Sequence, residues 1–387
     1  MKYNYLLKSL GLIISAGLLS ACGSDDAEKT LEPFDGLAVI QASGENESNI
    51  EFTDGISEIE SGFNVEESTD YAVFTHGEYF YHLGKGSNES LQKYHIEEPE
   101  LGYYPNDGFS LRGANETTSA NPHYLVFLGD DANTGVITRY GSTEAWVVNL
   151  DASVSEDFVI DTLDLSAHSA PISDTDTDPE MSMAFIYDEK LFITLQNLDV
   201  WTATTNAKVV VFDTNTWQEI DTDTSTQGTQ AISLTLQNHQ SSALYGDQLY
   251  LGSLVYGSPN TGGIELINLS TYSTEVLIDD KAVSKIAATK EGNIFFSDYA
   301  SWENNSLYKL NSDNSYQLVS SELEGINITA FASPDMHVWL GTNSFENKNQ
   351  IYRIDGTLDY SLDLSLNDVV ISSVETNFKP IQISFMD

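Results

Sequence analysis

A unit of four short apolar segments recurs along the chain, and this repeat constrains the fold more than any other feature of the sequence. The unit is clearest where apolar segments at 183–187, 191–195, 208–212 and 217–220 are separated by polar turns. Alternating apolar residues in runs of this length predict strands, and Asp-, Asn- and Thr-rich turns between them predict antiparallel neighbours. The unit is therefore expected to be a four-stranded antiparallel meander.

The predicted second strands of successive units start at regular intervals of 57, 55, 58, 45 and 44 residues. These starts are Tyr79, Val136, Leu191, Leu249, Ile294 and Val338. The preceding first strands carry a small residue where innermost strands would crowd together, at Ala72, Ala184, Ala243, Ala287 and Ala330. The third strands end at a residue whose side chain is expected to cap the next turn, at Asp213, Asn268, Asn311 and Asp355.

Serial four-stranded units without helical segments predict an all-β protein, a β-propeller. Six units lie inside the chain, and its two ends supply the strands of a seventh. The C-terminal segment Pro380–Phe385 is expected to be a first strand, with 37–40, 49–52 and 56–59 as its three partners. Such a blade would close the ring and cover the free strand edges. Seven blades are predicted, with six or eight as the alternatives.

The N-terminus has the pattern of an export signal. Lys2 and Lys8 precede an apolar run, 10–19, that is too short to span a membrane, and Leu19-Ser-Ala-Cys22 follows it. This segment resembles a bacterial lipoprotein signal with its lipobox, which implies cleavage before Cys22 and lipid attachment to that residue. An ordinary secretory signal with an incidental cysteine is the alternative. The predicted organisation is a signal peptide at 1–21, an acidic tether at 22–34 and one propeller domain at 35–387.

The resemblance to lipoproteins also implies a location. Gly23 follows the cysteine where inner-membrane lipoproteins carry Asp, so the outer membrane is expected, with the domain on its periplasmic or cell-surface side. Cys22 is the single cysteine, so the fold must form without disulfides. The formal net charge of −43 becomes −45 once Lys2 and Lys8 are removed. So acidic a chain is not expected to bind nucleic acid or anionic lipid surfaces.

Turn motifs carry a second resemblance. Segments such as Phe212-Asp-Thr-Asn-Thr216 resemble the propellers of the Tyr-Val-Thr-Asn repeat group and, more loosely, the quinoprotein-like propellers. The resemblance implies the fold and says little about activity. The blades lack the regular Ala-x-Asp-x-x-Thr-Gly-x-x-x-Trp docking motif of pyrroloquinoline quinone dehydrogenases, so no organic cofactor is predicted.

Motifs for catalysis or metal binding are weak. The seven histidines show no metal-ligand spacing, and no Gly-x-Ser-x-Gly elbow is present. Four carboxylates alternate at Asp174, Asp176, Asp178 and Glu180, a pattern compatible with calcium. Pro179 occupies the position where an EF-hand needs glycine, so a solvated acidic loop is the favoured interpretation. No metal or catalytic residue is therefore predicted.

Aromatic residues recur at one position of the repeat. Each lies seven to ten residues after the start of a second strand, at Trp201, Tyr256, Trp302 and Phe345. Because equivalent loops of a propeller emerge on the same face, these four are the predicted ligand or partner face. The alternative is that each side chain caps the core of its own blade.

The sequence therefore predicts an outer-membrane-anchored propeller that binds a protein partner or small ligand without converting it. One version is an accessory to receptor-mediated uptake of a nutrient or iron chelate, with an outer-membrane protein as partner. An envelope-assembly scaffold is a second version. A propeller enzyme with an axial site, a lactonase-type hydrolase or an oxidoreductase, is the alternative from another class.

Overall fold

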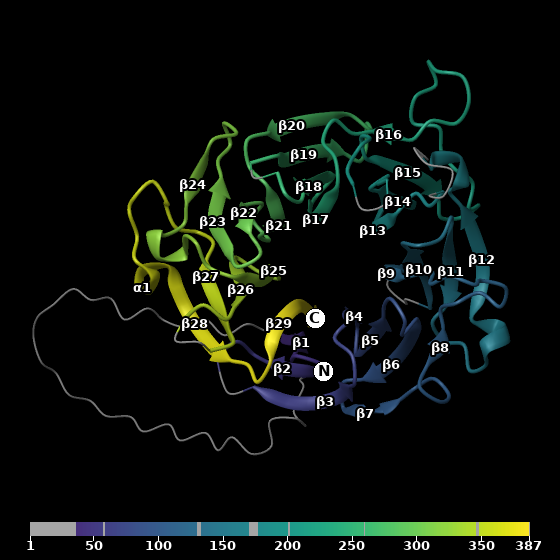
Figure 1. Cartoon of the computed structure of the whole chain (residues 1–387), viewed down its shortest axis with the longest axis horizontal. Helices are drawn as coiled ribbons and strands as arrows, with labels where there is room; N and C mark the ends of the chain where they lie inside the picture. The colour runs from purple at the N-terminus through teal and green to yellow at the C-terminus, as the bar shows by residue number, and fades with distance from the viewer. Residues whose placement is uncertain are drawn as a thin grey trace, which may run out of the picture.

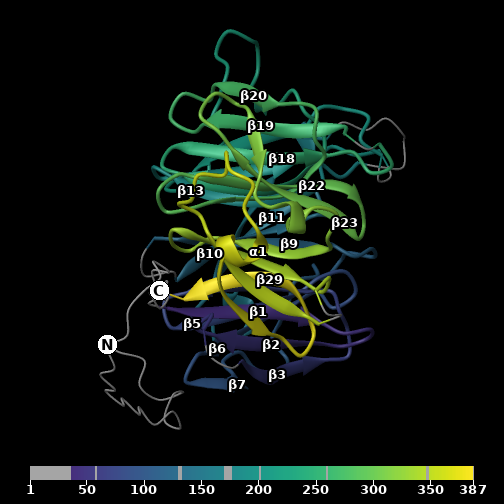
Figure 2. The ribbon, with the colours of Figure 1, turned by 90° about the vertical axis from the view of Figure 1, so that its left-hand side faces the viewer.

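The computed structural model describes residues 36–56, 59–129, 133–169, 177–199, 202–258, 260–345 and 348–386. Cys22, Trp201, Asp174 and Asp176 lie outside this part of the chain. Seven antiparallel sheets stand in a ring around a central channel, so the predicted seven-bladed propeller is confirmed (Figure 1). Seen from the side, the ring is a thick disc (Figure 2). In the described residues no helix reaches the length and hydropathy needed to cross a bilayer.

Each blade contributes one strand to the wall of the channel. These innermost strands are β4 (Tyr71–His76), β9 (Pro122–Leu128), β13 (Met181–Tyr187), β17 (His239–Tyr245), β21 (Val283–Ala288), β25 (Ile328–Ala332) and β29 (Lys379–Met386). The second strands, in the same order of blades, are β5 (Tyr79–Gly84), β10 (Thr134–Arg139), β14 (Lys190–Leu195), β18 (Gln248–Leu254), β22 (Ile294–Ser301), β26 (His337–Thr342) and β1 (Leu37–Ser43). All six predicted second strands are thus confirmed.

The third strands continue each sheet outward. They are β6 (Ser90–His95), β11 (Glu144–Asn149), β15 (Lys208–Asp213), β19 (Gly262–Asn268), β23 (Asn304–Leu310), β27 (Gln350–Asp355) and β2 (Ser48–Thr53). The outermost strands are β7 (Glu98–Gly102), β12 (Val159–Asp164), β16 (Ile232–Ser233), β20 (Thr274–Ile278), β24 (Tyr316–Leu318), β28 (Val370–Glu375) and β3 (Glu60–Glu66). A short β8 (Phe109–Ser110) also pairs with β6. The helical elements are η1 (Ser155–Asp157), η2 (Ser166–His168), η3 (Ser321–Leu323) and α1 (Leu366–Val369).

We number the blades 1 to 7 in chain order. Blade 1 holds β29 and β1–β3, blade 2 holds β4–β8, and blades 3 to 7 hold β9–β12, β13–β16, β17–β20, β21–β24 and β25–β28. The predicted small residues in the innermost strands are all buried, because neighbouring inner strands approach most closely there.

Blade 1 closes the ring by combining both ends of the chain, as predicted. The innermost β29 pairs antiparallel with β1, with Leu37 opposite Met386. The Gln382 side chain also bridges to blade 2, where it accepts from Val73 N (3.0 Å) and donates to Val73 O (2.7 Å). β29 is thus paired along one edge with β1, and side-chain hydrogen bonds tie it to blade 2.

One predicted fourth strand was wrong, and another lies partly outside the described residues. In blade 1 the outer strand is β3, which begins at Glu60, directly after the predicted 56–59, of which 57 and 58 are not described. In blade 4 the segment 217–220 forms only a bridge between Phe212 and Glu219, and the outer strand is the distant two-residue β16. Trp217 has a positive φ of 55°, but so does Tyr272 (62°) at the same place in the turn before β20, so this conformation belongs to the turn and does not explain the missing fourth strand.

Local turn chemistry explains most of the hairpins. Asp188 and Glu189 have φ of 48° and 57°, as a two-residue turn between β13 and β14 requires. Asp213 Oδ1 accepts from the backbone of Asn215 (3.0 Å) and Thr216 (2.9 Å), so the predicted cap is present. Asn268 and Asp355 cap their turns in the same way.

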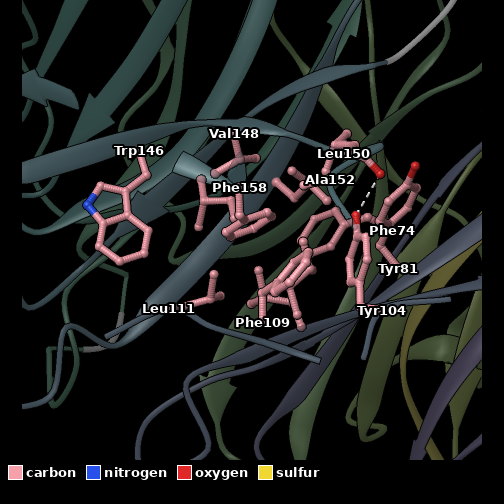
Figure 3. Close-up of a cluster of buried hydrophobic side chains, with 14 of the residues drawn as sticks. Phe74, Tyr81, Tyr104, Phe109, Leu111, Trp146, Val148, Leu150, Ala152 and Phe158 are labelled. Carbon is pink, nitrogen blue, oxygen red and sulfur yellow. Dashed lines mark hydrogen bonds between the residues drawn. The ribbon is translucent and has the colours of Figure 1, made fainter. Parts of the chain in front are cut away.

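Hydrophobic cores lie between neighbouring blades as well as within them. The core between blades 2 and 3 brings together aromatic side chains from both, including Phe74, Tyr104, Phe109 and Phe158 (Figure 3). The Tyr104 hydroxyl donates to Leu150 O at 2.9 Å, which satisfies the one polar group buried with its ring. Continuous cores of this kind make the ring a rigid frame for its loops.

Candidate functional site at the mouth of the channel

Two of the three described aromatic candidates lie together at one mouth of the channel. Tyr256 follows β18 and Trp302 follows β22, and both side chains line the same pocket of about 250 Å³. Their exposed fractions are 54% and 71%, so neither ring serves as buried core. We call this cavity the mouth pocket; its lining also includes Gln240, Leu254, Ser284, Lys285, Tyr299, Asn305, Asn327, Ile328, Thr329, Lys379 and Ile381.

Phe345 occupies the same place in its repeat but does not line the mouth pocket. Its ring meets that of Tyr352 at 5.3 Å, nearly edge to face, and packs against the core of blade 7. For this residue the structure therefore has the alternative arrangement, in which the aromatic side chain covers the core of its own blade. Trp201 and Cys22 lie outside the described residues.

Glycines fix the loop that presents Tyr256. Gly262 has a φ of 143°, and a Cβ there would lie 2.0 Å from Ser253 O. At Gly263, with a φ of 156°, a Cβ would lie 1.9 Å from Ile278 O. Only glycine permits β18, β19 and β20 to run so close at this point. The loop itself is closed by a bond from Val255 N to Thr261 O at 3.0 Å, so Tyr256 is held in place.

A long hairpin presents Trp302. Strands β22 and β23 remain paired as far as Ser301 and Asn304, so Trp302 and Glu303 form the tip. Beneath it, Tyr299 meets Tyr256 edge to face at 6.0 Å. The Tyr256 hydroxyl donates to Gln240 Oε1 at 3.4 Å, and burial followed by the neighbouring Tyr299 raises its pKa. The result is an aromatic rim contributed by blades 5 and 6.

The floor of the mouth pocket comes from the first residues of the innermost strands. Gln240, Lys285, Thr329 and Lys379 belong to β17, β21, β25 and β29. Burial, and then the charge of Lys85, lower the pKa of Lys285 to about 8. Among the described lining residues there is no Asp, Glu or His. The floor therefore carries positive charge with no acidic group in its lining.

Lys85 reaches the same region from blade 2. It directly follows β5, and its backbone N donates to Asp70 O at 2.9 Å. The next residue, Gly86, donates to Asn121 Oδ1 at 3.1 Å, which ties this loop to the start of β9. Burial lowers the pKa of Lys85, and the nearby Asp70 opposes that shift.

His123 completes this part of the channel wall. Burial, and then Lys85, lower its pKa to about 3, so the ring is neutral at pH 7 and its Nδ1 lies 3.3 Å from Ser182 O. Since Lys85 perturbs both His123 of blade 3 and Lys285 of blade 6, these three groups share one electrostatic environment.

The described part of the acidic loop does not form a cluster of outward carboxylates. Glu180 is buried, and its Oε2 accepts from Leu198 N at 2.8 Å. In the described residues no group of three His, Cys, Asp or Glu side chains is placed to hold a metal ion. Asp178 is the other member described; Asp174 and Asp176 are not, so neither the favoured solvated loop nor the calcium alternative is tested.

Sequence reasoning missed the lysines of the mouth. A usable signal was present: only 16 of 387 residues are Lys or Arg, yet Lys285 and Lys379 both fall within the first three residues of an innermost strand. Residues at that position line the mouth in every blade of a propeller. Scarce cations at such positions could have been identified once the strands were assigned.

Comparison with known proteins identifies the fold class and nothing narrower. No protein-family model matches the chain, and no curated protein is detectably similar in sequence. Hydrazine synthase of Kuenenia stuttgartiensis is similar in structure, with a TM-score of 0.56, 10% identity and coverage of 81% of this chain and 88% of that one. Apo AztD of Citrobacter koseri gives a TM-score of 0.52 at 12% identity, covering 90% and 97%.

A third similar structure is an inactive variant of virginiamycin B lyase from Staphylococcus aureus with quinupristin. Its TM-score is 0.50 at 9% identity, covering 81% of this chain and 93% of that one. The three differ in function, so the likeness shows the propeller fold alone.

Proposed function

We propose that this chain is an outer-membrane lipoprotein, anchored through Cys22, whose propeller binds a small ligand in the mouth pocket without converting it. The observation that carries the proposal is the aromatic rim. Exposed Tyr256 and Trp302 come from two blades and line one pocket with a polar floor. Large rings held by short loops provide contact area at low conformational-entropy cost.

One feature favours binding over turnover, and a second favours a small ligand over a protein. The described lining contains neither His nor a carboxylate, so Lys285, Lys379 and the tyrosines are its ionisable groups and no acid–base pair with a carboxylate is formed there. The pocket, at about 250 Å³, matches a small molecule better than a protein segment. These features support an accessory to receptor-mediated uptake over an envelope-assembly scaffold, with a membrane receptor as the expected partner.

The test is recovery of the ligand from native membranes. The lipidated protein is purified by affinity from its own envelope, and bound small molecules are identified by mass spectrometry. We expect a molecule that is present with the parent and absent with Trp302→Ala. The matched control is Tyr245→Ala, which removes a 42% exposed ring from the other end of β17. Equal recovery with both variants would contradict the proposed pocket.

The anchor has a separate test. Cys22→Ser is expected to release a folded protein from the membrane fraction, because the single cysteine is the only lipidation candidate of this type. Unchanged sedimentation of that variant with membranes would contradict the lipoprotein assignment and leave the pocket untouched.

A further inference from the structure

Most described cations have a carboxylate partner, and those at the channel do not. Salt bridges are formed by Lys93, Arg112, Arg139, Lys190, Lys281, Lys348 and Arg353. Within the described residues, six cations form none, namely Lys85, Lys208, Lys285, Lys290, Lys309 and Lys379, and of these Lys285 and Lys379 line the mouth pocket. In a chain with 59 acidic residues, two cations in one pocket whose described lining has no acidic residue are unexpected.

The arrangement costs stability as it stands. Lys285 is desolvated, and the like charge of Lys85 opposes its protonation further. Thr329 adds a second unsatisfied group, because its buried Oγ1 has no hydrogen-bond partner among the described residues. Uncompensated groups of this kind gather at sites whose ligand supplies the missing partner. The missing partner here is negatively charged and accepts hydrogen bonds.

We propose that the mouth pocket binds an organic oxyanion, a carboxylate or phosphate carried on a planar apolar group. The oxyanion lies on Lys285, Lys379 and Thr329, and the planar group lies against Tyr256 and Trp302. This inference rests on the proposed function and names the chemical class of its ligand. The acidic surface elsewhere repels anions, so an oxyanion is expected to bind at the lysines of the mouth pocket rather than elsewhere on the described surface.

The pH dependence follows from the groups that face Lys285. They are Lys379 and the tyrosines Tyr256 and Tyr299 in the pocket, and Lys85 across the channel. The neighbouring Asp298 is already paired with Lys281 at 2.7 Å. Lys285 is charged below its pKa, so oxyanion affinity is expected to be full at pH 7 and to fall as the pH rises through about 8.

Calorimetry with three probes tests the proposal. Phenyl phosphate and benzoate combine a ring with each oxyanion, and benzyl alcohol has the ring alone. We expect the first two to bind and benzyl alcohol to bind at least about tenfold more weakly. Comparison of phenyl phosphate with benzoate then distinguishes a phosphate from a carboxylate as the preferred group.

Variants separate this inference from the proposed function. Lys285→Met is expected to weaken phenyl phosphate binding about tenfold or more and to remove its loss between pH 7 and about pH 9. The matched control is Lys290→Met, an exposed lysine beyond the other end of β21. It should bind as the parent does.

Each outcome decides one claim. If Trp302→Ala abolishes binding and Lys285→Met does not, the pocket stands and the oxyanion assignment is wrong. If Lys285→Met abolishes binding and Trp302→Ala does not, the oxyanion site stands and the aromatic contribution is wrong. Parental binding by both variants, or no binding of any probe up to its solubility limit, would overturn the inference.

Discussion

Two lysine and tyrosine clusters in this propeller use the same residue types in opposite ways. In blade 2, Lys93 Nζ lies 2.9 Å from Asp151 Oδ1, 3.2 Å from Leu150 O and 4.3 Å from the centroid of the Tyr79 ring. Its side chain is 4% exposed. At the mouth, Lys285 lies in one pocket with Tyr256 and forms no salt bridge among the described residues. The blade 2 cluster includes a carboxylate, whereas the described lining of the mouth pocket has no acidic residue.

This difference distinguishes a lysine whose charge is neutralised within the fold from a lysine whose charge is not. A buried cation is stable when a carboxylate, a carbonyl and aromatic faces surround it, as they surround Lys93. The mouth pocket has aromatic rings and lysines in one lining, and no acidic residue among its described lining residues. The two clusters are therefore expected to be lost together when the ring is opened, but to respond differently to substitution of their lysines.

Removing the closing strand should disrupt both clusters together. Deletion of residues 379–387 removes Lys379 from the mouth, exposes the edge of β1 that pairs with β29, and removes the Gln382 bonds to Val73 of β4. We expect a loss of more than about 5 kcal/mol in the free energy of unfolding, with aggregation through exposed strand edges. Thermal melting and size-exclusion chromatography measure this. A truncated protein that melts at the parental temperature would show that β29 does not hold the ring closed.

Acidification should destabilise the buried frame through its neutral histidines. His82 and His239 are 2% and 1% exposed, and burial lowers the pKa of each to about 3. The unfolded chain takes up protons below about pH 6.5, so stability is lost as the pH falls from there. Each histidine is expected to cost about 2 kcal/mol at pH 5. Glu51 and Glu265, whose pKa values burial raises, reduce the net loss.

Denaturant unfolding at pH 7 and pH 5 checks this prediction. His82→Gln retains a donor for Gln41 Oε1, 2.9 Å from His82 Nε2, and removes the titration. The variant should therefore lose about 2 kcal/mol less than the parent on acidification. An identical pH dependence in the two proteins would contradict the neutral, buried state of His82.

Aromatic residues at the same position of the repeat should differ in how much their replacement by Ala lowers the free energy of unfolding. Phe345 packs on Tyr352 and the core of blade 7, so Phe345→Ala is expected to destabilise by about 1 to 2 kcal/mol. Trp302 is 71% exposed, so Trp302→Ala should change stability by less than about 0.5 kcal/mol. Chemical denaturation of the two variants compares them. Equal losses of unfolding free energy would indicate that both rings pack in a hydrophobic core.

The sequence predicts this fold well because its determinants are local. Alternating apolar residues and Asx turns such as Asp213 define each hairpin from neighbouring residues, and seven blades follow from counting. Prediction fails where the partner is distant. Strand β16 joins its sheet only after a loop that begins at Trp217, so the nearer segment 217–220 was chosen wrongly.

The same limit applies to the site. The spacing places Tyr256 and Trp302 on one face, but it cannot distinguish them from Phe345, whose ring turns toward Tyr352 of its own blade. Lys85 and Lys285 are 200 residues apart and meet only because blades 2 and 6 face each other across the channel. Their proximity results from closure of the ring, and no pattern in the sequence near either lysine indicates it.

The most direct test of this account measures the stability of two lysine variants side by side. The central claim is that the charge of Lys285 is held for a ligand, whereas the charge of Lys93 is held for the fold. Lys93→Met should lower the free energy of unfolding by about 2 kcal/mol, because Leu150 O and Asp151 lose their partner. Lys285→Met should leave it unchanged or raise it by up to about 1 kcal/mol, because a desolvated charge without an acidic partner is removed. Destabilisation of both variants by similar amounts would contradict the account.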